Sequence, residues 1–210
     1  MEMLLGDLSQ KLLDERQSAR WNRLFLQGGL AQVRLQQRRG YLLQLVATAP
    51  EGVEEKEAFR AEMQRVLALA GGQVDPCVRS GLLASFQHLK PCLGVALALQ
   101  RYGRDLGLRV AVAGGTCTFA NFESAQAPWW TVVGTQAVRV GELLAGTPGG
   151  TILVGPEVYD QAERDMPGAL ASCLVSQEYL GEHLAQVSIS VPPPRGSAQL
   201  STFAGLGLTS

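Results

Sequence analysis

Short apolar runs alternate with longer amphipathic stretches along residues 41–191, and this alternation most restricts how the chain can fold. Residues 41–47 are almost all apolar, which is typical of a buried strand. The apolar side chains of residues 59–70 then recur at helical spacing, and Gly71 and Gly72 end that stretch. Such an alternation predicts strands and helices that pack in layers around one core.

The same spacing rules place further elements along the chain. Strands are predicted at residues 73–78, 81–86, 108–112, 116–121, 130–133, 151–154, 174–180 and 184–191. Helices are predicted from Pro91 onward, after Thr135 as N-cap, and over residues 156–164, and Gly114 and Gly115 should bend the chain. The order strand, helix, strand, strand, helix, strand predicts an α/β (α+β) fold. Its core is ferredoxin-like (βαββαβ) with C-terminal αβ additions, and helices cover one face of the sheet.

Composition divides the chain into three parts. Residues 1–39 are predicted to be an amphipathic helical segment, and residues 40–191 the folded domain. Residues 192–210 begin with three prolines and are then rich in Gly, Ser and Thr, which is typical of a flexible tail.

The N-terminal segment is basic, with seven basic and four acidic residues in the first 40. Gly28 and Gly29 should end its helix, and a short second helix is expected over residues 30–37. Acidic residues are interleaved with the basic ones, so we expect packing against the domain or a second copy rather than on a membrane or nucleic acid. Three leucines recur there at helical spacing, namely Leu5, Leu8 and Leu12.

Charge and cysteine usage exclude several classes of protein. The net charge of −1 argues against a nucleic-acid-binding protein, and no apolar run is long enough to span a membrane. The start of the chain is acidic where a signal peptide would be basic, which favours a cytoplasmic location. The four cysteines and two histidines lack the spacing of a metal site, so free thiols and no metal are expected.

Four segments carry a family resemblance. Residues 71–86 are GGQVDPCVRSGLLASF, residues 108–115 are LRVAVAGG, residues 131–134 are TVVG, and residues 149–159 are GGTILVGPEVY. In this order and spacing they resemble the hairpin, strand, helix-entry and late-strand motifs of the class III nucleotidyl cyclase homology domain. The resemblance covers residues 40–191. It implies a head-to-tail dimer with nucleotide sites at the subunit boundary.

The metal-binding half of such a site matches poorly. In this family two aspartates hold two divalent cations, which activate the ribose hydroxyl and neutralise the triphosphate. The resemblance places these aspartates at Thr48 and Ser80. Neutral hydroxyls cannot replace carboxylates as ligands of hard cations. The phosphate loop holds Pro50, which has no N–H to donate, and Glu51, which would repel phosphate.

The half of the site that selects the purine and stabilises the transition state matches the family no better. The family's purine-selecting lysine and aspartate correspond to Pro76 and Thr135. Its transition-state asparagine and arginine, four residues apart on one helix, correspond to Val138 and Glu142. Valine cannot form the hydrogen bond and glutamate has the opposite charge. Because both halves are changed, neither a homodimer nor a heterodimer should assemble an ordinary cyclase site.

The leading hypothesis is therefore a non-catalytic, cofactor-free, cyclase-like domain that acts as a dimerising interaction or regulatory module in signalling, as a homodimer or a heterodimer. A first alternative is a small-molecule or nucleotide sensor that uses the remodelled cleft without turnover. A second is an atypical cyclase with ligands such as Glu51, Glu54 or Asp75. The candidate interface residues are Leu5, Leu8, Leu12, Trp21, Phe25, Trp129, Trp130, Val138 and Glu142.

Overall fold

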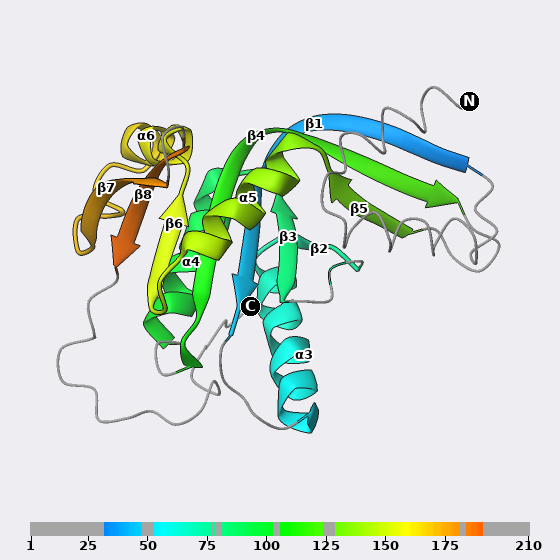
Figure 1. Ribbon diagram of the computed structural model, residues 1–210, viewed down its shortest axis with the longest axis horizontal. Coiled ribbons are helices and arrows are strands. Elements are labelled where there is room, and N and C mark those ends of the chain that lie inside the picture. Colours follow the sequence, from blue (N-terminus) through cyan, green and yellow to red (C-terminus); the bar gives the residue numbers. More distant parts are fainter. Residues whose placement is uncertain are drawn as a thin grey trace.

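The structure, a computed structural model, describes residues 32–47, 53–76, 78, 81–102, 106–123, 129–180 and 184–190. Its strands are β1 (Gln32–Val46), β2 (Gln73–Val74), β3 (Leu82–Phe86), β4 (Arg109–Glu123), β5 (Trp129–Val133), β6 (Thr151–Val154), β7 (Leu174–Leu180) and β8 (Leu184–Ser190). Its helices are α3 (Val53–Leu69), α4 (Leu89–Tyr102), α5 (Thr135–Gly146) and α6 (Pro156–Asp165) (Figure 1).

The strands of the described residues form one eight-stranded sheet in the order β2-β3-β1-β4-β6-β8-β7, with β5 added to β4. β4 and β6 run parallel, and the other neighbours pair antiparallel. The mixed α/β fold expected from the sequence is confirmed. β1 and β4 remain paired over 15 residues each, and their outer halves extend beyond the main sheet together with β5 (Figure 1). We call this extension the arm (residues 32–39, 116–123 and 129–133).

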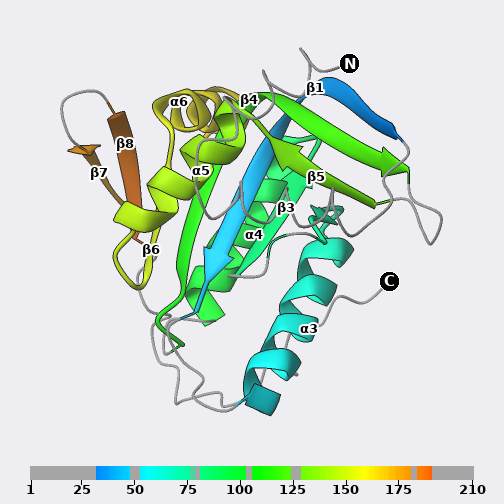
Figure 2. The same ribbon diagram turned by 45° about the vertical axis from the view of Figure 1, so that its right-hand side comes forward.

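Helices cover both faces of the sheet, so the expectation of one covered face is wrong. α3, α4 and α6 pack on one face, where Leu43 and Val112 point inward. α5 packs on the opposite face, against Leu42 and Ala113 (Figure 2). Adjacent residues Leu42 and Leu43 are both 0% exposed, because successive side chains of a strand point to opposite faces. A continuous apolar run in a central strand is the consequence of this double burial.

The helix expected over residues 30–37 is also wrong, because β1 begins at Gln32. Residues 32–39, assigned to a helical segment by the sequence analysis, pair with β4 from Glu123 to Thr116. β1 continues without interruption through Gly40, the first residue of the expected domain. The rest of the expected N-terminal helix and the tail after residue 191 lie outside the described residues.

Three smaller expectations need correction. The strand expected over residues 73–78 is limited to Gln73 and Val74. The two strands expected on either side of Gly115 are one strand, β4, in which Gly115 adopts φ +141°, a value that favours glycine. Thr135 is the first residue of α5 rather than its N-cap, which is Gly134.

None of the helices in the described ranges is both long and apolar enough to cross a bilayer.

Candidate functional site

Asp75 fastens the β2–β3 hairpin to β5. Its side chain is 0% exposed, and its Oδ2 accepts hydrogen bonds from Thr131 Oγ1 at 2.5 Å and from the Val132 N–H at 2.9 Å. Its own N–H donates to the Leu83 carbonyl at 2.8 Å. The Asp75 carboxyl group therefore links the β2–β3 hairpin to β5, which lies far away in the sequence. Neighbouring Pro76, which the sequence resemblance matches to the family's purine-selecting lysine, is exposed.

Thr48 and Ser80, which the sequence resemblance matches to the family's metal ligands, lie outside the described residues. Thr48 follows the end of β1 and Ser80 precedes the start of β3. These two strand ends lie side by side, because Leu45 near the end of β1 pairs with Leu82 at the start of β3. Gly81 keeps these strands in close contact. Its φ is +85°, and a Cβ there would lie 2.3 Å from the Leu45 carbonyl oxygen, so a side chain is excluded.

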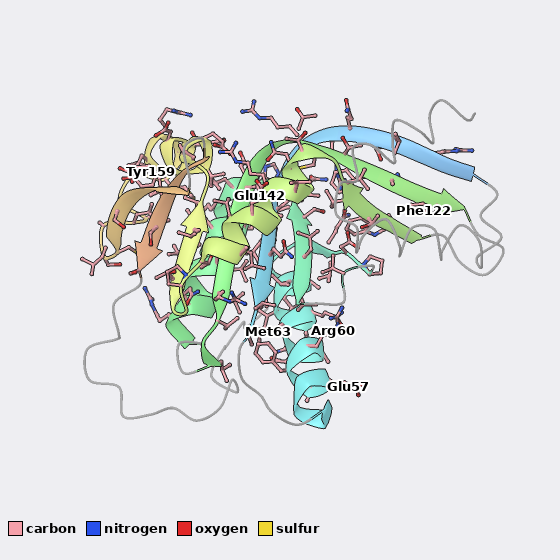
Figure 3. The ribbon with its side chains drawn as sticks, in the orientation of Figure 1. Glu57, Arg60, Met63, Phe122, Glu142 and Tyr159 are labelled. Atoms are coloured by element: carbon pink, nitrogen blue, oxygen red, sulfur yellow. The ribbon has the colours of Figure 1, made fainter. Side chains whose placement is uncertain are left out.

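Arg60 of α3 binds the segment between β2 and β3, a role that the sequence did not predict. From α3 its guanidinium donates to the Gly81 carbonyl at 3.0 Å and to the Val78 carbonyl at 2.6 Å (Figure 3). These bonds give hydrogen-bond donors to the carbonyl groups of Val78 and Gly81, which lie between β2 and β3. No motif signals this role, because an arginine on a surface helix has the same local pattern whether it binds a turn or solvent.

α5 presents the two expected interface residues Val138 and Glu142 on its outer face. Val138 is 43% exposed and Glu142 is exposed, whereas Val140, Leu143 and Leu144 face the core. Positions four apart lie on the same helical face, as the sequence analysis expects. Figure 3 shows Glu142 on the outer side of this helix.

The neighbouring Arg139 has a different partner. Its guanidinium donates to Glu157 Oε2 at 3.1 Å, which links α5 to α6. An exposed ion pair of this kind contributes little stability but fixes the direction of the side chain. Arg139 is thus engaged with Glu157 of α6.

The arm and the adjacent β2 line an open cavity of about 360 Å³, which we call the cavity of the arm. The Trp130 ring lies 5.8 Å from the Phe119 ring, centroid to centroid, in a tilted arrangement. The lining includes Gln36, Arg38, Gln73, Phe119, Asn121 and Trp130. Trp130, an expected interface residue, therefore forms part of a cavity wall. Trp129 belongs to β5, but its side chain lies outside the described side chains, as do Leu5, Leu8, Leu12, Trp21 and Phe25.

The described thiols are not reactive groups. Cys92 and Cys117 are buried and free, and Cys173 is free and partly exposed. Burial raises the pKa of Cys117 to about 11, against a smaller opposing effect of Arg38, and raises the pKa of Cys92 even further. Across the described ranges, no group of three His, Cys, Asp or Glu side chains is arranged to hold a metal ion.

Comparison by sequence and by structure gives different results. No protein-family model and no curated protein matches the sequence. The structure is similar to the adenylyl cyclase CyaB from P. aeruginosa, with a TM-score of 0.61 and 15% identity over 79% of this chain and 100% of that one. It is also similar to the guanylate cyclase domain of RhGC from Catenaria anguillulae in complex with GTP, with a TM-score of 0.58 and 10% identity over 74% and 98%.

A third similar structure is the non-canonical dimeric guanylyl cyclase domain of the RhoGC fusion protein from Blastocladiella emersonii. Its TM-score is 0.59, with 9% identity over 75% of this chain and 97% of that one. The described chain therefore has the fold of adenylyl and guanylyl cyclase domains, and the resemblance stated from the sequence is confirmed for the fold.

Proposed function

We propose that this chain is a non-catalytic cyclase-like domain that acts as a dimerising interaction or regulatory module. The observation that carries the proposal is the outer face of α5, where Val138 and Glu142 stand at the positions of the family's asparagine and arginine. This assignment of positions rests on the sequence resemblance, and in this chain α5 directly follows β5.

Charge is the main reason to expect no turnover. Cyclisation of a nucleoside triphosphate needs cationic groups around a polyphosphate of roughly −4, aimed at the charge that develops during the reaction. Glu142 adds an anion to the α5 face, and the nearest arginine of that helix, Arg139, is bound to Glu157. No rearrangement of side chains within α5 supplies the missing guanidinium without breaking that ion pair.

The divalent cations that the fold family uses do not fit this chain. Thr48 and Ser80 offer neutral hydroxyls at the two metal positions, whereas hard cations need anionic oxygen ligands. Asp75 is a carboxylate nearby in sequence, but its Oδ2 is buried and accepts two hydrogen bonds from β5. These residues therefore do not fit the metal ions of the fold family.

A dimeric assembly is supported by the exposure of Val138 on the α5 face. Val138 is an exposed large apolar side chain (43%) on a helix whose opposite face is fully packed. One similar structure is a non-canonical dimeric guanylyl cyclase domain, and two other structures of that fusion protein's cyclase domain are monomeric. We propose that this chain uses the α5 face for contact with a second copy or with a related domain.

Sedimentation velocity of the full chain tests the assembly. The wild type should sediment as a dimer, and Val138→Asp should shift the population to monomer because it buries a charge in the interface. Leu69→Asp is the matched control, because Leu69 on α3 is also exposed (56%) but lies off the α5 face. A wild-type monomer that captures no partner, or equal effects of both variants, would contradict the proposal. Formation of cyclic product from ATP or GTP would contradict its non-catalytic part.

A further inference from the structure

We propose that the cavity of the arm binds a small aromatic carboxylate. This inference goes beyond the proposed function and does not depend on it, because Pro76, Thr135 and Val138 do not line the cavity. The strands place its lining on one face. Gln36 and Phe119 are register partners on β1 and β4, and Asn121 and Trp130 are register partners on β4 and β5.

The cavity wall can accept an aromatic ring. Phe119 and Trp130 form a tilted pair 5.8 Å apart, and the Arg38 guanidinium lies over the Phe119 ring, with Cζ 4.1 Å from the ring centroid. Trp130 is partly exposed and lines the cavity. A planar ligand that stacks there gains apolar burial and the favourable geometry of aromatic pairs.

Arg38 supplies the charge recognition. One of its amino groups donates to Gln73 Oε1 at 2.7 Å, which fixes the direction of the guanidinium. No other hydrogen bond joins Arg38 to a residue in the described ranges, and a guanidinium carries five N–H donors. The described lining contains no acidic residue, so an anion meets attraction and no repulsion. Arginine is the side chain best suited to a carboxylate, because its two parallel N–H groups match the two oxygens.

Size and charge together limit the ligand class. About 360 Å³ is near the lower end of cavities that hold small molecules, which suits one ring or a fused pair of rings. A single arginine balances one negative charge and leaves a polyphosphate uncompensated. The side-chain amides of Gln36 and Asn121 can bond polar substituents on the ring.

Isothermal titration of the full chain with indole-3-carboxylate tests the proposal, and indole-3-carboxamide is the matched ligand of equal shape and no charge. The acid should bind at least about 10-fold more tightly than the amide, the value of one charge-assisted hydrogen bond pair. This comparison uses the wild type and needs no variant to fold. No binding of the acid at millimolar concentration, or equal binding of acid and amide, would overturn the proposal.

Variants then locate the site. Arg38→Gln should weaken binding of the acid by about 10-fold or more, and Arg38→Lys should recover part of the loss because it keeps the charge without the planar fork. Arg39→Gln is the control, since it removes the same charge from the next position of β1, whose side chain points to the opposite face. Arg39→Gln should leave the Kd for indole-3-carboxylate within about twofold of the wild-type value. Equal effects of the Arg38 and Arg39 variants would overturn the assignment to this cavity.

Discussion

Replacing Asp75 with alanine should lower the free energy of unfolding by about 3–5 kcal/mol. The variant removes the acceptor of the Thr131 hydroxyl and the Val132 N–H, which bond Asp75 Oδ2 at 2.5 and 2.9 Å. Thr131 is 5% exposed and Val132 is 6% exposed, so water has little access to the donors left behind. Each buried donor without a partner costs about 1–3 kcal/mol, and the lost side chain adds a small cavity.

Urea denaturation followed by circular dichroism measures this effect. Asp75→Asn keeps an oxygen acceptor of nearly the same shape and should lose less than half as much stability. Thr131→Val removes one donor, and the double variant with Asp75→Ala should lose less than the sum of the single losses, because the two residues share a bond. The difference between the sum of the single losses and the loss in the double variant is the coupling free energy between Asp75 and Thr131, and so between the hairpin and β5.

Ser85→Ala provides the matched control. Ser85 lies on β3, is 4% exposed, and its Oγ has no hydrogen-bond partner within the part of the chain that the structure describes. Its removal should change stability by less than about 0.5 kcal/mol, or raise it. A loss below about 1 kcal/mol for Asp75→Ala would refute the assignment of Asp75 as the link between the hairpin and β5.

Three further predictions concern the same scaffold. Gly81→Ala should lower the thermal midpoint more than Gly71→Ala does. Both residues have positive φ, which strains alanine at either position, but a Cβ at Gly81 also meets the Leu45 carbonyl oxygen at 2.3 Å, whereas Gly71 has open space. Arg60→Met should speed amide hydrogen exchange in the hairpin and lower stability by about 1–3 kcal/mol, because two turn carbonyls lose a charged donor; unchanged exchange would show that the turn does not need this contact. Burial raises the pKa of the Cys117 thiol from its ordinary value of 9.0 to about 11 in the native state, so the free energy of unfolding should fall as the pH rises from 9 to 11. Urea denaturation should show a smaller fall in Cys117→Ala than in the wild type. An equal fall in both proteins would count against this cause.

The central elements were predictable from the sequence because each has a local cause. The strand that begins with Thr151 is a short apolar run, and α6 begins at Pro156 because proline suits the first turn of a helix. The order of such elements was enough to predict the fold class. Helix spacing likewise predicted that Val138 and Glu142 share one face.

The errors arise where distant residues decide the structure. Residues 32–39 are mostly polar and gave no strong strand signal, and they are extended because β4, some 80 residues later, pairs with them. The continuous apolar pair Leu42 and Leu43 already indicated burial on both faces, but which helix covers the second face depends on where α5 packs. Propensity is overridden by tertiary pairing in such segments.

The site shows the same division. The assignment of side chains to family positions rests on the sequence motifs alone and stays a prediction. The bonds that Arg60 and Asp75 make, 18 to 57 residues away along the chain, follow from no such motif. The cavity of the arm is assembled from four strands, so no local pattern of Gln36, Arg38 or Trp130 predicts it.

The most direct test of the account is an assay for ring closure. The purified full chain is incubated with ATP and with GTP, each with Mg²⁺ and with Mn²⁺, and the products are separated and identified by mass spectrometry. The account predicts no cyclic AMP or cyclic GMP above the level of a protein-free control, because the α5 face offers Val138 and Glu142 in place of an amide and a guanidinium. Cyclic nucleotide that accumulates in proportion to the amount of protein would contradict it.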